Sequence, residues 1–269
     1  MAIRTKTKGE NTIHIVELHT ERVGVAVMGI RPLIFNAMSQ KAKGSLLLPP
    51  KKMNATEKDA NLKHDPLAEY RSSVYAHEND DHPTRLMFPA AAFKSAARSA
   101  ALRIPGVKKT EIGQLMWVEG DYVDIYGVPQ MLISVTRSAD AARTPDIRTR
   151  AILADWCCTI SVRYVTPNLN QQQIASLLAS AGLLMGIGDW RQEKGAGNYG
   201  QFEIVNSSDP KFQTITKTGI RDVQDDALRD PSAYDLETGR MLAWFQEESV
   251  RRGKVIPSAR ATNGNAEAR

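Results

Sequence analysis

A glycine-rich segment, Gly186 to Gly200, lies between a predicted helix at about 171–185 and a predicted short strand at 201–205. This order limits what the chain can fold into, because dinucleotide-binding turns have a strand before the glycines and a helix after them. The literal G-x-G-x-x-G at 195–200 is therefore not predicted to bind a dinucleotide. The Gly-Lys-Ser/Thr of a phosphate loop is also missing from the sequence.

A second helix is predicted at about 89–104, and its charged residues are all basic. Pro89 suits the first helical turn, and Pro105-Gly106 ends the pattern. Lys94 and Arg98 are four residues apart and share one face of this helix. Its apolar stripe contains Phe93, Ala96, Ala97, Ala100 and Ile104.

Strands are predicted at 12–30, 115–136 and 156–165, from alternating apolar residues. The most regular one has Trp156, Cys158, Ile160, Val162 and Tyr164 on one face. Between the second and third of these strands we expect an arginine-rich connection at 137–150. Without the long polar segment 36–87, the order approximates β-α-β-β-α-β. We therefore predict an α+β fold with a ferredoxin-like (RRM-like) core, a large insertion after the first strand and a C-terminal helical extension.

The predicted domain organisation follows from these patterns. The core covers 12–205 and contains the insertion 36–87, and an acidic, turn-rich segment with a helix at 235–252 makes up 206–252. The small polar residues of 253–269 are expected to be disordered. The sequence has no apolar run long enough for a membrane span and no apolar leader at its start, so we expect a cytoplasmic protein. Neighbouring Cys157 and Cys158 are expected to be reduced thiols.

The chain carries a formal net charge of +5 and has a pI near 9.2, a mild preference for polyanionic partners. Within the glycine-rich segment, glycines allow close backbone approach, while Arg191 and Lys194 supply charge and Trp190 and Tyr199 supply stacking surfaces. These are the elements of single-stranded nucleic-acid contact. The structural alternative is that Gly186 caps the helix and the other glycines form an irregular turn.

These features in this order resemble the RAMP superfamily of CRISPR-associated RNA-binding proteins, and in particular the backbone subunit that polymerises along guide RNA. The helix "FPAAAFKSAARSAA" is similar to the family's P-x-S-x-x-K-G-x-x-R pattern, and the glycines of 186–200 match a glycine-rich loop between the last core helix and strand. Two departures are Ala91-Ala92, where a hydroxyl is common, and Ser95, where glycine is common. The segment after 206 has no counterpart in the pattern.

The resemblance and the charge pattern imply non-catalytic binding of single-stranded nucleic acid through its backbone, with RNA favoured over DNA. The insertion 36–87 would be a finger or thumb, and subunits would assemble head to tail as a homo-oligomer in a CRISPR-effector-like particle. Arg143 and Arg148 either contact the nucleic-acid strand or form ion pairs with Asp140 and Asp146. The predicted nucleic-acid contacts are Lys94, Arg98, Arg143, Arg148, Gly186, Gly188, Trp190, Arg191, Lys194, Gly195, Gly197 and Tyr199.

Two other functions stay open at this point. A metal-independent endoribonuclease of the same superfamily would need a histidine near the glycine-rich segment, which contains none. A phage single-stranded-DNA-binding or assembly protein fits the same composition, so the host is a prokaryotic cell or a phage-infected one.

The slicing members of the family use an Asp in the loop after the first strand, and that loop has none here. The segment His77 to His82 offers imidazoles and carboxylates, but we expect a solvated loop there and predict no metal, no cofactor and no catalytic residue.

Overall fold

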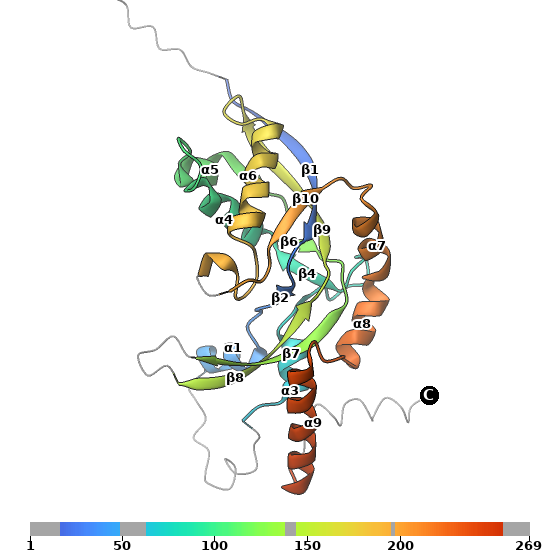
Figure 1. The fold of residues 1–269 in the computed structure, drawn as a ribbon. Coiled ribbons are helices and arrows are strands. Elements are labelled where there is room, and N and C mark those ends of the chain that lie inside the picture. The colour runs from blue at the N-terminus through green and yellow to red at the C-terminus, as the bar shows by residue number, and fades with distance from the viewer. Residues whose placement is uncertain (1–16, 49–62, 138–143, 195–196, 255–269) are drawn as a thin grey trace, which may run out of the picture.

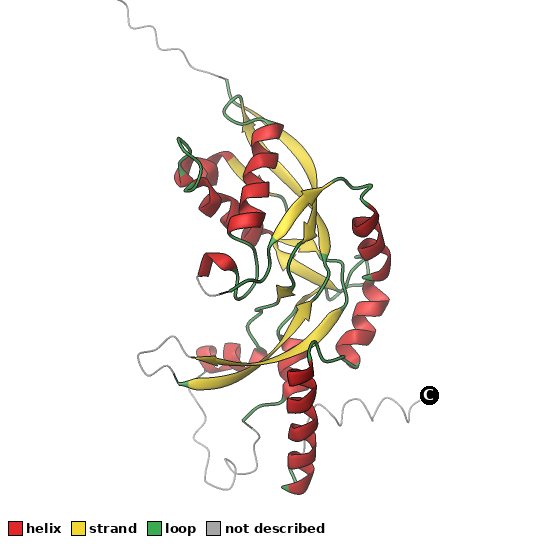
Figure 2. Ribbon diagram, in the orientation of Figure 1, coloured by secondary structure: helices red, strands yellow, loops and turns green. Residues whose placement is uncertain are grey.

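The computed structural model describes residues 17–48, 63–137, 144–194 and 197–254. Its largest sheet is antiparallel, with the strand order β10-β1-β9-β5. These strands are β1 (His19–Gly29), β5 (Met116–Val118), β9 (Cys157–Thr166) and β10 (Phe202–Val205). Helix α4 (Ala90–Ala101) lies between β1 and β5 in the chain, and α6 (Gln171–Leu184) lies between β9 and β10. The fold combines helices with antiparallel sheets, which confirms the predicted α+β class (Figure 2).

Strand β9 shows why this sheet has a buried face. Cys158, Ile160 and Val162 have no exposed surface, whereas Thr159 between them is exposed. Helices α4 and α6 cover this apolar face, which confirms the predicted alternation (Figure 1). Helix α6 begins with the expected capping box, in which the Asn170 side chain accepts from the Gln173 amide and the Gln173 side chain accepts from the Asn170 amide.

Part of the opposite face is covered by the segment after β10. Helix α7 (Pro210–Thr218) places Phe212 and Ile215 against Ala26, Met28 and Cys157. Strand β1 is therefore buried on both sides near its end, and its apolar residues run on without alternation. Both cysteines are free, as their adjacency predicted, and both are buried.

The segment 206–234 is more ordered than its turn-rich sequence indicated. It contains α7 and α8 (Arg221–Arg229), and Asp209 caps α7 by accepting from the amides of Lys211 and Phe212. Helix α9 (Leu236–Arg251) agrees with the predicted helix at 235–252 and packs against β7 (Pro129–Arg137). In the described part of the chain, no helix is both long and apolar enough to cross a membrane.

A second antiparallel sheet has the strand order β2-β8-β7. Strand β2 is Leu33–Ile34, and β8 is Pro145–Leu153. The predicted arginine-rich connection is therefore wrong for residues 145–150, which form the first two thirds of a strand paired with β7. Polar residues hide this strand in the sequence, because one end of it is exposed on both faces. Helix α3 (Pro66–Ser72) packs on β8 with Tyr70 fully buried, so the segment 36–87 contributes to the core as well as to the surface.

A third small sheet joins β3 (Tyr75–Ala76), β4 (Leu86–Pro89) and β6 (Tyr122–Asp124), with β4 in the centre. Helix α1 (Gln40–Leu47) precedes this region, and α5 (Lys109–Leu115), which the sequence did not predict, connects α4 to β5. The Gln224 side chain of α8 is fully buried and binds five backbone groups. It ties α8 to the β3-β4-β6 sheet.

Candidate nucleic-acid interface

The first glycines of the segment 186–200 are buried and serve close packing. Gly186 and Gly188 adopt φ values of 68° and 82°, which favour glycine. A Cβ at Gly188 would lie 2.6 Å from the Ile34 carbonyl oxygen, and the Gly186 amide donates to the Ala181 carbonyl at 3.0 Å. Both glycines are therefore explained by the fit of this segment against α6 and β2, as the structural alternative held.

Trp190, two residues after Gly188, has an unusual backbone conformation. Trp190 has a φ of 49°, a strained value for a bulky residue. The Tyr199 amide donates to the Trp190 carbonyl oxygen at 3.3 Å, and a Cβ at Gly197 would lie 1.4 Å from that same oxygen. Gly197 thus allows the two ends of the loop to meet, while Gly195 lies outside the described residues.

Trp190 and Tyr199 form an aromatic pair on one face of the β2-β8-β7 sheet. Their ring centroids are 6.1 Å apart at an interplanar angle of 43°, and both rings remain partly exposed. The Arg150 guanidinium lies 6.0 Å from the Trp190 ring centroid. Below the rings lie the buried side chains of Ile34, Leu132 and Ile152, and Tyr234 packs against the same cluster.

Two arginines continue this face along β8. Arg148, Arg150 and Ile152 alternate along the strand, so they share one face, and Arg148 is exposed. Arg150 forms an ion pair with Asp189, and its side chain is only 11% exposed. Burial lowers the pKa of Arg150 and the Asp189 carboxylate opposes that shift, but a guanidinium stays charged at neutral pH.

Arg191 and Lys194, which lie beside and within the short 3-10 turn η1 (Gln192–Lys194), differ in the contacts that they form. Arg191 Nε lies 2.9 Å from Glu193 Oε2, and Arg191 also donates to the Gly188 carbonyl oxygen at 3.1 Å. Burial raises the pKa of Glu193, but hydrogen bonds from Ser99 and Arg191 outweigh it and hold that pKa below its usual value. Lys194 is exposed, and among the described residues it forms no ion pair. Lys194 is thus the more available cation of the two.

Lys94 and Arg98 are both residues of α4. The Arg98 Nε is buried and lies 2.8 Å from the position of a Cβ at Gly113 in α5. Ser99, the next residue of α4, is the one that hydrogen-bonds to Glu193 in η1. Neighbouring helical residues point about 100° apart, so the face of Arg98 differs from the one that meets the glycine-rich segment. Among the described residues, no hydrogen bond, ion pair or ring contact joins Lys94 or Arg98 to Trp190 or Tyr199.

The two residues of the predicted arginine connection have different outcomes. Arg143 lies outside the described residues. Asp146, one of the proposed carboxylate partners, forms its ion pairs with Lys63 at 3.2 Å and with His64 at 3.6 Å. Arg148 is exposed and forms no ion pair among the described residues, and Asp140, the other carboxylate proposed as a partner, lies outside them.

Two members of this face were not among the predicted contacts. Arg150 was visible only as part of an arginine-rich stretch, and the signal that could have placed it is its alternation with Arg148 and Ile152. Tyr234 is far away in sequence, and it reaches the face because its amide donates to the Met131 carbonyl oxygen of β7 at 2.8 Å. No local pattern indicates that contact.

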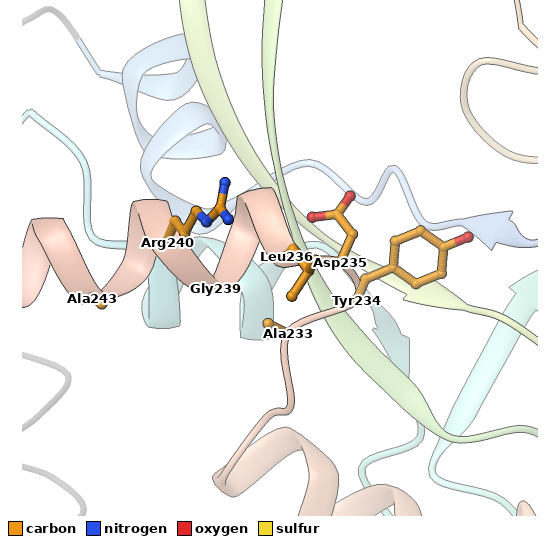
Figure 3. A pocket seen from close by; sticks show the side chains of 7 residues that line it. All are labelled: Ala233, Tyr234, Asp235, Leu236, Gly239, Arg240 and Ala243. Atoms are coloured by element: carbon orange, nitrogen blue, oxygen red, sulfur yellow. The ribbon is translucent and has the colours of Figure 1, made fainter.

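A hollow beside the start of α9 has fewer charged and aromatic side chains than the face that carries Trp190 and Tyr199 (Figure 3). It is lined by Ala233, Tyr234, Asp235, Leu236, Gly239, Arg240 and Ala243. The Asp235 carboxylate caps α9 by accepting from the Thr238 amide at 2.7 Å. The remaining lining is mostly small or apolar, so the hollow carries no set of catalytic groups.

Comparisons with known proteins give a structural similarity but no family assignment. No family model and no curated protein matches the chain. Among solved structures, the chain is similar to a chain in the cryo-EM structure of the type III-B Cmr-beta complex bound to cognate target RNA. The identity is 14%, the TM-score is 0.35, and the match covers 70% of this chain and 59% of the other. The chain therefore spans less than two thirds of that structure's chain.

Proposed function

We propose that this protein binds single-stranded nucleic acid, RNA in preference to DNA, on the outer face of the β2-β8-β7 sheet. One observation carries the proposal: the partly exposed Trp190 and Tyr199 rings lie on the same sheet face as Arg150 and the exposed Arg148. Stacking surfaces beside cations are the two components that non-sequence-specific binding of single strands requires.

The two components have distinct energetic roles. A base stacked on an aromatic side chain contributes about 1–3 kcal/mol and needs no particular sequence. An arginine that neutralises a phosphate releases counterions, so its contribution falls with rising salt concentration. Arg148 and Lys194 are exposed and suit the phosphates, whereas Arg150 is paired with Asp189 and instead orients the Trp190 ring.

We further infer a RAMP-like, ferredoxin-like core for this protein. Supporting this, β1, α4, β5, β9, α6 and β10 follow one another as β-α-β-β-α-β, and the glycine-rich segment joins the last helix to the last strand. The proposal includes a repeating, non-catalytic subunit of a CRISPR-effector-like ribonucleoprotein that assembles head to tail. Such contacts are heterologous and extend into filaments.

The test measures binding to labelled RNA and DNA single strands of the same sequence, by fluorescence anisotropy over a series of salt concentrations. Trp190→Ala should weaken binding by about 1–3 kcal/mol, with the salt dependence unchanged. Arg148→Glu should weaken binding at low salt and reduce the salt slope by about one phosphate contact. Wild-type protein should bind RNA more tightly than DNA.

Lys217→Glu is the matched control, because Lys217 is an exposed cation on α7, away from the β2-β8-β7 face (Figure 1). It should change affinity much less than Arg148→Glu does. The proposal fails if the Trp190 and Arg148 variants bind like the wild type, or if Lys217→Glu weakens binding as much as they do. Circular dichroism of each variant separates lost binding from lost folding.

A further inference from the structure

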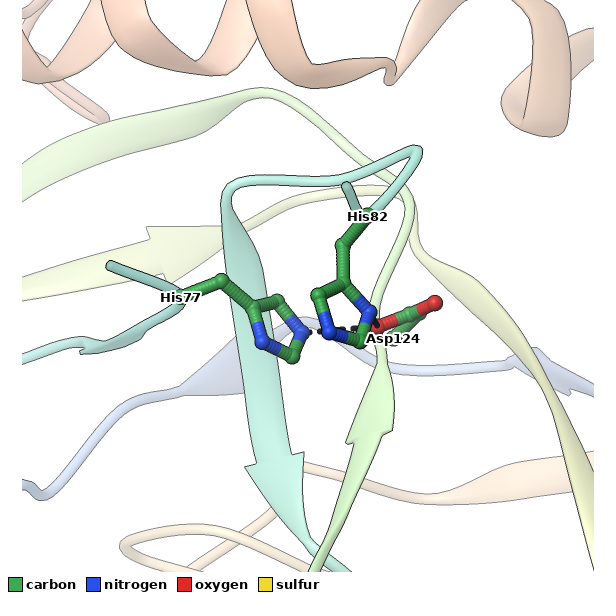
Figure 4. Close-up of side chains that lie close together, drawn as sticks. All are labelled: His77, His82 and Asp124. Carbon is green, nitrogen blue, oxygen red and sulfur yellow. Dashed lines mark hydrogen bonds and ion pairs between the residues drawn. The ribbon is translucent and has the colours of Figure 1, made fainter. Parts of the chain in front are cut away.

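His77 directly after β3, His82 in the turn that follows and Asp124 at the end of β6 converge at one end of the β3-β4-β6 sheet (Figure 4). His77 Nε2 lies 2.7 Å from Asp124 Oδ1, and His82 Nδ1 lies 3.2 Å from the same oxygen. One donor atom from each residue lies within 4.8 Å of the other two. His77 and Asp124 are 47 positions apart in sequence, so the fold itself brings them together.

The strand register explains this convergence. The His77 amide donates to the Arg85 carbonyl oxygen at 2.9 Å, so His77 continues the β3–β4 pairing. On the other side of β4, Asp124 pairs with Met87. Residues 85 and 87 share a face of β4, and their partners therefore project to that same face. Leu86 and Phe88 face the core, which leaves the cluster on the outer side.

Helix α8 fixes the backbone around the cluster. Arg221 donates to the carbonyl oxygens of Asn79 at 2.7 Å and Thr84 at 3.2 Å, within and just beyond the turn that carries His82. Gln224 accepts from the amides of Arg85 and Leu86, both at 2.8 Å, and donates to the Ile125 carbonyl oxygen at 2.8 Å. One helix thus holds the start of β4, the residue that follows Asp124 and the turn that carries His82, and such backbone support favours a preorganised site.

The charges near the cluster leave it accessible to a cation. Arg221 contacts the turn that carries His82, and it pairs with Asp80 at 2.8 Å and with Asp225 at 3.9 Å. Arg85 lies 3.5 Å from the Asp225 carboxylate. The positive charges around the cluster are therefore paired with carboxylates, and His82 is 40% exposed in its side chain, which gives a path from solvent.

We propose that His77, His82 and Asp124 bind a divalent transition-metal ion, with Zn²⁺ as the best fit. Two imidazoles and one carboxylate are ligands that Zn²⁺ accepts, and three protein ligands leave a fourth position for water or a ligand oxygen. In tetrahedral coordination, neighbouring donor atoms at the usual zinc distances lie about 3.3 Å apart. The present separations of 2.7 Å and 3.2 Å need only a small expansion.

One movement accompanies metal binding. The two imidazole rings are stacked, with centroids 3.6 Å apart and planes 8° apart. An imidazole nitrogen binds a metal in the plane of its ring, so stacked rings cannot both address one ion. His77 has only 10% of its side chain exposed, whereas His82 is in a surface turn. His82 therefore rotates to complete the coordination, and the bonds to Asp124 are replaced by bonds to the metal.

The full-length protein, treated with a chelator and then dialysed, is titrated with Zn²⁺ by calorimetry. Co²⁺ is a second probe, because its visible absorption reports the number and type of ligands. We expect one ion per chain and a rise in the unfolding temperature with added Zn²⁺. His82→Gln and Asp124→Asn should each weaken Zn²⁺ binding by more than about tenfold, since each removes a direct ligand.

His64→Gln is the matched control. His64 also lies between two carboxylates, with Nδ1 2.8 Å from Glu69 and Nε2 3.6 Å from Asp146, and Lys63 beside them. This variant should bind Zn²⁺ like the wild type. Absence of one-to-one binding by the wild type would overturn the proposal, as would equal affinity in His82→Gln. If Asp124→Asn does not fold, His82→Gln alone decides, because His82 is an exposed turn residue. Nucleic-acid affinity is measured separately, so either proposal can fail without the other.

Discussion

Replacing Gln224 by methionine tests how strongly α8 is joined to the β3-β4-β6 sheet. The Gln224 side chain is fully buried, and its Oε1 accepts from the amides of Arg85 and Leu86 at 2.8 Å. Its Nε2 donates to the carbonyl oxygens of Ile125, Gly127 and Gly219 at 2.8–3.0 Å. Methionine has nearly the same shape, so Gln224→Met removes these bonds and leaves no large cavity.

The magnitude follows from the groups that lose a partner. The buried Leu86 amide costs about 1–3 kcal/mol when unsatisfied, and the partly buried Arg85 amide costs less, so the free energy of unfolding should fall by about 2–4 kcal/mol. The three carbonyl oxygens add less, because a carbonyl has a second acceptor position and tolerates partial satisfaction better. A loss of this size is a large share of the stability of a typical domain.

Urea unfolding followed by tryptophan fluorescence measures this loss. Gln213→Met is the control, because Gln213 is exposed on α7 and its side chain donates to the Ser207 carbonyl oxygen at 2.6 Å, on the surface. The control should change the stability by no more than about 0.5 kcal/mol. A loss below about 1 kcal/mol in Gln224→Met would refute the reasoning, because it would mean that water or a rearranged backbone satisfies the two amides.

Two further predictions concern the glycine-rich segment and the main sheet. Gly197→Ala should destabilise the protein by about 1–3 kcal/mol in thermal unfolding and weaken nucleic-acid binding, because its Cβ would lie 1.4 Å from the Trp190 carbonyl oxygen. Gly44→Ala in α1 is the control, because its Cβ would meet nothing within 4 Å, and it should instead stabilise the protein by about 0.5–1 kcal/mol. Equal effects of the two substitutions would contradict the packing role of Gly197. The Ser161 hydroxyl and nearby arginine guanidinium groups lower the pKa of Glu119 below its ordinary value of 4.5. A lowered carboxyl pKa stabilises the folded state above the unfolded pKa, and this contribution is lost as the pH falls through the folded pKa. Glu119→Gln should therefore reduce the urea midpoint at pH 7 and approach the wild type in acid below the ordinary value; a difference that does not depend on pH would contradict this assignment.

Local patterns in the sequence located the elements whose partners lie close in the chain. The capping box of Asn170 and Gln173, the apolar stripe of α4 and the alternation of β9 all depend on spacings of a few residues. Each of these predictions agrees with the structure. Their success has a common cause, because burial of one face imposes a periodicity that remains visible in the sequence.

The remaining elements depend on contacts between distant residues. The first half of strand β8 is exposed on both faces, so Arg148 and Arg150 do not produce the alternation of apolar and polar residues that predicts a strand. The strand is defined by its pairing with β7. The candidate site changed for the same reason. Trp190 and Tyr199 were expected from composition, but their place over β2 and β8 depends on tertiary packing. Likewise, the sequence pointed to carboxylates within residues 77–82, whereas the one that His77 and His82 share belongs to Asp124 on another strand.

The position of α7 has a consequence for dividing this chain. The predicted boundary at 205 follows the last strand of the main sheet, yet Phe212 and Ile215 are what shield Ala26 and Met28 from water. A protein truncated after residue 205 would present a bare apolar strip on that sheet, and exposed apolar strips promote aggregation. A soluble fragment would have to keep α7, and it would need α8 as well, since Gln224 binds the amides of β4. The segment after residue 205, which the sequence places outside the core, thus covers part of the second face of the main sheet.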